Sequence, residues 1–145
     1  MNGFTIGFAS PSEKDEIRLL LENSQLPSED IGDHLEHFLV AKSEGKVVGA
    51  VGLELFGASA LLRSLVVERA QRGKSLGKEL YRAVVTHAKD RGVNELGLLT
   101  TTAEGFFAKE GFRKVEGEMI PAYVKSTKEY QILCPSSAVC MVKRI

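Results

Sequence analysis

The spacing of apolar and polar positions predicts a chain in which strands and helices alternate. Short runs that are apolar throughout, or apolar at every second residue, are typical of strands. Such runs occupy residues 5–9, 38–42, 46–55, 60–67 and 95–100. The second and third runs are separated only by Ser43, Glu44 and Gly45, so they are predicted to form a hairpin.

Apolar positions recur at helical spacing in two places, up to Asn23 and from about residue 76 to residue 91. Ser10, Pro11 and Glu13 supply the start signals of the first helix, and Gly92 closes the second. Residues 26–31 are predicted to form a loop that leads into a short helix or turn.

The last part of the chain contributes a short helix and the final strands of the sheet. The helix is expected at residues 102–109 and a strand at 112–116. The last strand is expected at either 130–133 or 138–143. This order of elements indicates a single α/β or α+β domain over residues 1–145, with a mixed sheet.

Composition narrows the class of protein. Nineteen basic and nineteen acidic side chains give a net charge of zero, which argues against a general nucleic-acid partner. The apolar runs are far shorter than the ~20 residues of a membrane span, and the first ten residues lack the pattern of a secretory signal. We therefore expect no membrane partner and a reducing, cytoplasmic setting, in which Cys134 and Cys140 are buried and inert.

The composition contains an excess of glycine, and two of the fourteen glycines stand where a strand meets a helix. Gly73 and Gly77 let main chain approach a ligand, while Arg72, Lys74 and Lys78 add positive charge. Backbone amides at a helix N-terminus have no partner inside the helix and bind phosphate groups well. The turn is therefore predicted to bind phosphate or pyrophosphate, although its spacing fits neither a P-loop nor a dinucleotide fingerprint.

The same turn resembles motif A of the GNAT acetyltransferase superfamily, [QR]-x-x-G-x-[GA]. Arg72 stands at the basic position, Ser75 at the middle glycine and Gly77 at the last one. Residues 103–112, AEGFFAKEGF, are similar to the family ending A-x-x-x-[FY]-x-x-x-G-F. The resemblance implies a GNAT fold, with a mixed and mostly antiparallel sheet of six to seven strands and flanking helices. It also implies acetyl-CoA as co-substrate.

The resemblance further implies which residues bind acetyl-CoA. The backbone of Leu65, Val66 and Val67 is expected to pair with the pantetheine arm. The turn, the start of the following helix and the second motif complete the set: Arg72, Gly73, Lys74, Ser75, Leu76, Gly77, Lys78, Thr101, Phe106 and Phe107.

Finer features resemble two branches of the superfamily. Residues 98–103 with the Phe pair after them resemble the amino-acid acetyltransferases that make N-acetylglutamate. Residues 61–65 (LLRSL) and 127–138 (TKEYQILCPSSA) resemble small GNAT proteins encoded with arsenic-resistance functions. These likenesses imply N-acetylation of an amino acid or a toxic analogue, such as an arsenic-bearing relative of glutamate. A protein or peptide N-acetyltransferase and a non-catalytic acetyl-CoA-binding sensor or partner module are the alternatives. Dimers are common in the family, so a homodimer is also expected.

Two catalytic positions depart from the family pattern. Phe107 replaces the tyrosine that often protonates the CoA thiolate, which leaves water, Ser64, Thr101 or Tyr123 for that role. Leu61 stands where the family often has a glutamate that acts as the general base. Glu54, in an otherwise apolar strand, is therefore the candidate base.

Arg63 is a charge inside an apolar strand, and a guanidinium can hold a carboxylate by two parallel hydrogen bonds. Arg63 is therefore predicted to bind the carboxylate of an amino-acid acceptor. Thr102 is also predicted to bind the acceptor, with residues 26–31 and 123–127 as walls of its site. His34 and His37 lack an obvious third ligand, so a solvated helix face is favoured over a metal site. His87 is expected to be structural.

Overall fold

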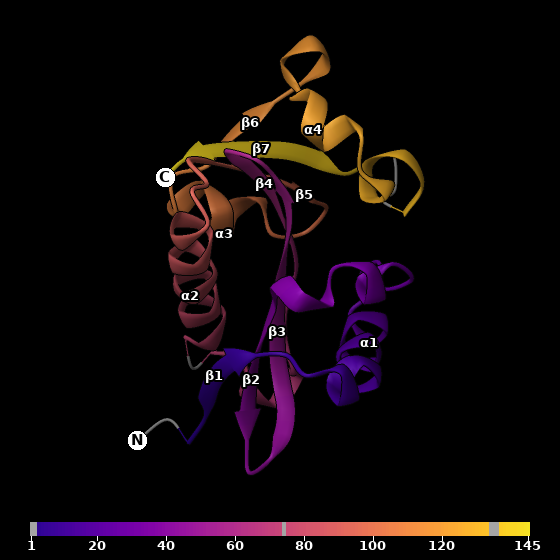
Figure 1. Cartoon of the computed structure of the whole chain (residues 1–145), viewed down its shortest axis with the longest axis vertical. Helices are drawn as coiled ribbons and strands as arrows, with labels where there is room; N and C mark the ends of the chain where they lie inside the picture. Colours follow the sequence, from indigo (N-terminus) through magenta and orange to yellow (C-terminus); the bar gives the residue numbers. More distant parts are fainter. Residues whose placement is uncertain (1–2, 74, 134–136) are drawn as a thin grey trace. The chain divides into compact units, whose positions relative to one another are not determined.

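The computed structural model describes residues 3–73, 75–133 and 137–145 and contains a seven-stranded mixed sheet. The strand order is β1-β2-β3-β4-β5-β7-β6. β4 pairs with β5 in parallel, whereas β1–β2, β2–β3, β5–β7 and β6–β7 are antiparallel. The predicted fold class, a mostly antiparallel mixed sheet of six to seven strands with helices beside it, is confirmed (Figure 1).

The observed elements follow the predicted ones closely. The strands are β1 (Thr5–Phe8), β2 (Phe38–Ser43), β3 (Lys46–Phe56), β4 (Ser59–Val67), β5 (Glu95–Thr100), β6 (Arg113–Val115) and β7 (Val139–Arg144). The α-helices are α1 (Lys14–Asn23), α2 (Leu76–Asp90), α3 (Glu104–Lys109) and α4 (Ala122–Lys125). Short 3-10 turns are η1 (Pro11–Glu13), η2 (Ile31–Asp33), η3 (Leu35–His37), η4 (Arg69–Gln71) and η5 (Gly117–Met119). Within the described ranges, no helix has the length and apolar character needed to cross a membrane.

The chain forms two compact units. The first comprises Met1–Glu54 and Arg63–His87, and the second comprises Leu55–Leu62 and Ala88–Ile145. The chain passes from one unit to the other inside β3, inside β4 and near the end of α2.

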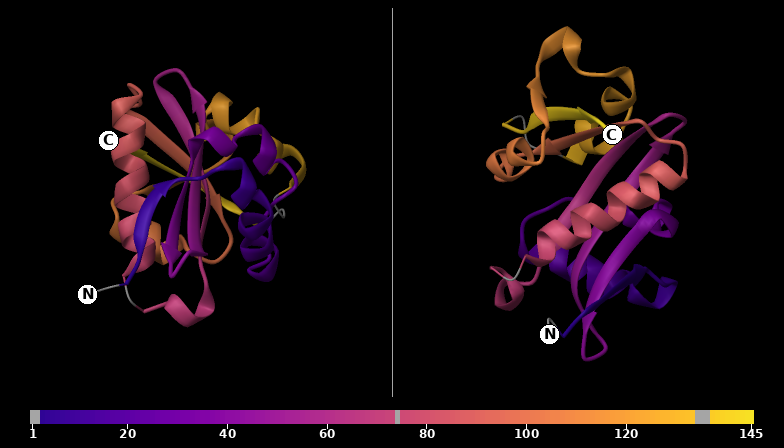
Figure 2. Two further views of the ribbon diagram at one scale, coloured as in Figure 1. Left: turned by 60° about the horizontal axis from the view of Figure 1, so that its bottom comes forward. Right: turned by 90° about the vertical axis from the view of Figure 1, so that its left-hand side faces the viewer.

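In the first unit, α1 and α2 lie on opposite faces of the strands, as Figure 2 also shows. The backbone amide of Ser10 donates to Glu13 Oε1 over 2.9 Å, which is the capping contact expected at the helix start. The stripe of α1 is buried in a core with apolar side chains of the loop after it and of β2 to β4: Ile17, Leu21, Ile31, Phe38, Val40, Val47, Ala50 and Val66.

The β2–β3 hairpin is fixed by a close contact between its two strands. Phe38 on β2 is paired with Gly52 on β3, and a Cβ atom at Gly52 would overlap the Phe38 ring. Because Phe38 is fully buried, its ring has no room to move away. Glycine at this position therefore keeps the two strands in register.

In the second unit, β7 lies between β5 and β6. Of the two predicted locations for the last strand, 138–143 is confirmed as β7, whereas 130–133 is wrong and belongs to a π-helix, η6 (Glu129–Leu133). The reason is local, because the Thr127 hydroxyl accepts the Tyr130 amide and the Thr127 carbonyl accepts the Gln131 amide. The side chains of Tyr130 and Ile132 are exposed, so no sheet face buries them.

Candidate functional site

The turn between β4 and α2 is anchored by the Arg72 guanidinium. Arg72 Nε donates to the Val67 carbonyl over 3.1 Å, and Nη2 donates to Ser24 Oγ at the end of α1 over 3.2 Å. Arg72, which is predicted to add positive charge and to bind acetyl-CoA, therefore also closes its own turn. A pocket of about 440 Å³ adjoins the turn, and Val67 and Arg72 line it together with side chains of α1.

The exposed part of this turn has the backbone geometry of a glycine-rich loop. Gly73 has φ +83° and Ser75 has φ +63°, so both residues are in the left-handed region that glycine favours. Both are exposed, and a Cβ at Gly77 would approach only Val67, at 3.8 Å. Main chain is thus open to a ligand at the start of the fifteen-residue helix α2. Lys74 lies outside the described residues, and Lys78 is exposed.

A buried group of charged side chains, which we call the Arg63 cluster, comprises Arg63, Asp30, Glu54 and His34. Arg63 Nη1 and Nη2 each donate to one oxygen of Asp30 over 2.7 Å, and Nη1 also donates to Glu54 Oε2 over 2.9 Å. Arg63 Nε donates to Ser64 Oγ over 3.1 Å. The guanidinium therefore links the loop after α1 with β3 and β4.

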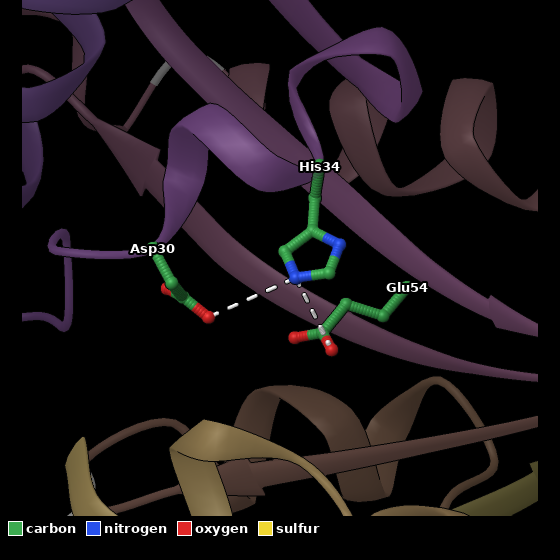
Figure 3. A group of neighbouring side chains, drawn as sticks. All are labelled: Asp30, His34 and Glu54. Carbon is green, nitrogen blue, oxygen red and sulfur yellow. Dashed lines mark ion pairs between the residues drawn. The ribbon is translucent and has the colours of Figure 1, made fainter.

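His34 completes the cluster. Its Nε2 lies 3.5 Å from Glu54 Oε1 and 3.8 Å from Asp30 Oδ2, and Figure 3 shows the ring edge pointing toward both carboxylates. The side chains of Arg63, Asp30 and Glu54 are 0%, 2% and 6% exposed, whereas that of His34 is 27% exposed. The imidazole is therefore the accessible member of an otherwise closed group.

The charge of Arg63 controls the ionisation of its main partner. Burial alone would raise the pKa of the Asp30 carboxyl, but the hydrogen bonds and positive charge of Arg63 outweigh it. The pKa of Asp30 is consequently held below its usual value, and the carboxylate is ionised at neutral pH.

The expectation that His34 has no third ligand-type residue nearby is wrong. Ligand atoms of Asp30, His34 and Glu54 lie within 4.8 Å of one another, because Asp30 stands four residues before His34 and Glu54 on β3 meets both of them. A metal ion among them would stand beside the Arg63 guanidinium on the same carboxylates, and the two positive charges would repel. These donors therefore fit proton chemistry better than metal binding.

His37 is also not on a solvated face. Its Nδ1 lies 3.4 Å from His87 Nε2, and the His87 ring packs edge-on against Phe8. The structural role expected for His87 is confirmed by these contacts.

The predicted residues of the second unit divide into exposed and buried ones. Thr101 and Thr102 are exposed after β5, and Phe106 is half-buried. Phe107 is buried between the rings of Phe106 and Phe112. The ring contacts show how Phe106 and Phe107 pack. Binding of acetyl-CoA by Thr101 and the two Phe residues, and of the acceptor by Thr102, stays a prediction.

The hydroxyl of Tyr123 is already used in a hydrogen bond within the second unit. It donates to Glu95 Oε2 over 2.9 Å, and its ring lies 5.8 Å from that of Phe56. Burial and the adjacent Glu95 carboxylate raise the pKa of Tyr123 well above its usual value. Tyr123 is therefore a poor proton donor to a thiolate.

Cys140 is buried on β7, as expected, while Cys134 lies outside the described residues. Burial and the charge of Glu95 raise the pKa of the Cys140 thiol to about 11. The unfolded thiol ionises near 9, so this group stabilises the fold below that pH, and its contribution is lost as pH rises toward 11.

In a Cys134→Ala background, Cys140 should react with a disulfide reagent far more slowly in the folded protein than in concentrated urea. The expected difference is on the order of 10²-fold or more near neutral pH, because the folded thiol is both buried and protonated. Thiol release followed by absorbance measures it. Similar rates in the folded and unfolded protein would contradict the assignment.

Comparison with known proteins identifies relatives of this fold and sequence. The model of the acetyltransferase (GNAT) family matches residues 7–112. An uncharacterised N-acetyltransferase of Chlorobaculum tepidum, CT2212, is 33% identical over 94 residues, 64% of this chain and 60% of that protein. The amino-acid acetyltransferase of Pseudomonas putida is 28% identical over 131 residues, 89% of this chain and 29% of that protein. The chain thus spans less than two thirds of these relatives.

A solved structure has the same fold over nearly the whole chain. N-acetylglutamate synthase from Neisseria gonorrhoeae, in complex with coenzyme A and N-acetyl-glutamate, superposes with a TM-score of 0.83. The match covers 97% of this chain and 35% of that one at 19% identity, so it establishes similarity of fold.

Proposed function

Since the chain belongs to the GNAT acetyltransferase family, we propose that it transfers the acetyl group of acetyl-CoA to the amino group of a small acceptor. The observation that carries the proposal is the β4–α2 turn, with Ser75 at φ +63° in the place of the family's glycine. The exposed main chain at Gly73 and Ser75 and the start of α2 can donate amide hydrogen bonds to the CoA pyrophosphate. Lys78 adds positive charge.

The reaction requires a neutral amine, a stabilised oxyanion and a protonated thiolate. In the proposal, the amide of Val66 on β4 donates to the thioester oxygen as it gains negative charge. Ser64 is the strongest of the candidate thiolate acids, because its oxygen accepts from Arg63 Nε and its own proton is left to donate. Ser64 also has φ +62°, in the left-handed region, and it is the only residue of β4 with a positive φ.

We propose an amino acid, or an analogue of one, as the acceptor. The amino-acid acetyltransferase relative and the N-acetylglutamate synthase neighbour support this class. A toxic glutamate analogue that carries arsenic is the finer proposal, and it depends on the likeness of residues 61–65 and 127–138 alone. The sequence predicts that Arg63 binds the acceptor's carboxylate. Its guanidinium already donates hydrogen bonds to Asp30 and Glu54, so few of its donors are left for an acceptor.

The test is release of CoA thiol from acetyl-CoA in the presence of the proteinogenic amino acids, one at a time, and of a short peptide with a free N-terminus. The proposal predicts saturable release with one or a few of them. Tight binding of acetyl-CoA without release on any amino acid would favour a non-catalytic module. Release with a peptide amine alone would favour a peptide N-acetyltransferase.

Substitutions at Ser75 test the assignment of the turn. Ser75→Gly should bind CoA at least as tightly as the wild type, because glycine adopts φ +63° without strain. Ser75→Val should weaken CoA binding about 10-fold to 100-fold, since a β-branched residue at this φ costs about 1–3 kcal/mol. Titration calorimetry with CoA measures both, and an unchanged affinity of the valine variant would refute the assignment.

A further inference from the structure

The proposed function does not yet assign the residue that deprotonates the acceptor, and the accessible imidazole of His34 in the Arg63 cluster can fill this role. We propose that His34 is the general base that takes a proton from the acceptor's ammonium group, and that the rest of the cluster positions it. The inference rests on the proposed function, because it assigns a residue to the deprotonation that acetyl transfer to an amine requires.

Accessibility distinguishes His34 from the other members. Its side chain is 27% exposed, whereas those of Glu54 and Arg63 are 6% and 0% exposed. A base must come within hydrogen-bond reach of the proton that it removes. Glu54, the base predicted from the sequence, is buried and accepts a hydrogen bond from Arg63, so in this proposal it positions His34 instead.

The charges around His34 suit a group that becomes positive during the reaction. Asp30, on the loop before η2, and Glu54, on β3, carry two negative charges against the single positive charge of Arg63 on β4. When His34 accepts a proton, its ring becomes positive, with Nε2 3.5 Å from the Glu54 carboxylate and 3.8 Å from the Asp30 carboxylate. The cluster then has no net charge, which is the favoured state for buried ionic groups.

The cluster is tied to the strand that is assigned to acetyl-CoA. Arg63 directly precedes Ser64 on β4 and donates to its hydroxyl, and Leu65, Val66 and Val67 follow. The same guanidinium holds Asp30, four residues before His34. One side chain thus fixes the loop that carries the base and the strand that carries the predicted oxyanion donor.

Acetyl transfer removes two protons from the acceptor's ammonium nitrogen. His34 accepts one proton from the ammonium nitrogen, and the nitrogen lone pair then attacks the thioester carbonyl. The carbon–sulfur bond breaks, Ser64 gives its hydroxyl proton to the CoA thiolate, and the second proton lost by nitrogen restores the Ser64 hydroxyl. The products are the amide, the CoA thiol and one proton, which His34 returns to solvent.

The experiment compares His34→Gln with His37→Gln, a neighbouring histidine that contacts Glu36 and His87 instead of the cluster. Acetylation of the best amino acid in the panel is measured as a function of pH, and CoA affinity is measured by calorimetry. His34→Gln should lower kcat about 10²-fold to 10⁴-fold with unchanged CoA affinity. Its rate should keep rising with pH where the wild type has levelled, because only amine already neutral in solution reacts. His37→Gln should stay within about threefold of the wild type, with the wild-type pH profile.

Glu54→Gln provides a second test that does not need His34 to be replaced. It keeps an oxygen that can accept from Arg63 but removes one negative charge near His34, so it should lower kcat and alter the pH profile without weakening CoA binding. Glu54→Gln with the wild-type kcat and pH profile would contradict the positioning role of Glu54. If His34→Gln does not fold, His34→Asn replaces it, because a lower kcat in Glu54→Gln is also expected if Glu54 itself is the base.

Three outcomes would overturn the proposal. A His34→Gln enzyme with wild-type kcat and pH profile would exclude the base role while leaving the proposed function intact. Loss of wild-type turnover on chelation, restored by a divalent cation, would assign Asp30, His34 and Glu54 to a metal instead. Absence of wild-type turnover with every amine would reject the proposed function and the inference together.

Discussion

Replacing Arg63 by alanine is expected to lower the free energy of unfolding by about 3–5 kcal/mol, because it leaves two buried carboxylates without their counter-charge. Asp30 and Glu54 are 2% and 6% exposed, and Arg63 supplies hydrogen bonds to both of them. Urea denaturation followed by circular dichroism measures the loss. The carboxylates would take up protons to relieve the repulsion, so the variant should lose less stability at acidic pH than at neutral pH.

Two comparisons make the Arg63 result specific. Arg18→Ala removes a surface ion pair with Asp15 on α1, and it should change the free energy of unfolding by less than about 1 kcal/mol. A triple variant with Asp30→Asn, Glu54→Gln and Arg63→Met removes all the charges together and should recover part of the loss. A loss for Arg63→Ala no larger than for Arg18→Ala would show that the cluster is not buried as described.

Replacing Gly52 by valine is expected to lower the free energy of unfolding by about 3 kcal/mol, at the upper end of overpacking effects. A side chain there would overlap the buried ring of Phe38, which is the cross-strand partner of Gly52. Glu54 follows two residues later on β3, and His34 precedes Phe38 by four residues. The substitution should therefore disturb the Arg63 cluster as well as the hairpin, and reduce turnover along with stability.

Gly105 on α3 provides a control for adding a side chain at a glycine where there is room for it. A Cβ at Gly105 would meet no atom within 4 Å, so Gly105→Ala should stabilise the protein by about 0.5–1 kcal/mol through its higher helix propensity. Combining Gly52→Ala with Phe38→Leu should recover stability relative to the sum of the single changes. If the two changes are simply additive, the proposed contact with the ring does not set the register.

The fold could be predicted from the sequence because its signals are local. The capping residues at Ser10 and Glu13, the turn at Gly45 and the helical spacing after Leu76 each fix an element by nearby residues alone. The tail was ambiguous because 130–133 and 138–143 have similar apolar character, and the Thr127 hydrogen bonds that decide between them depend on backbone geometry.

The site could be predicted only where chemistry and spacing coincide in one segment. The turn at Arg72 and Ser75 has such spacing, whereas the Arg63 cluster joins residues 33 and 9 positions away from Arg63. A charge inside an apolar strand does require a buried counter-charge, and this was the available signal. The sequence does not indicate that Asp30 supplies this counter-charge. Without the Asp30–Arg63 contact, the position of His34 beside the buried carboxylates cannot be predicted.

The most direct test of acetyl transfer to an amino acid identifies the product itself. The protein is incubated with acetyl-CoA and an equimolar mixture of the proteinogenic amino acids, and the mixture is separated and analysed by mass spectrometry. The account predicts an amino acid that carries one acetyl group on its α-nitrogen, formed only when acetyl-CoA and folded protein are both present. Binding of acetyl-CoA with no acetylated amino acid among the products would contradict it.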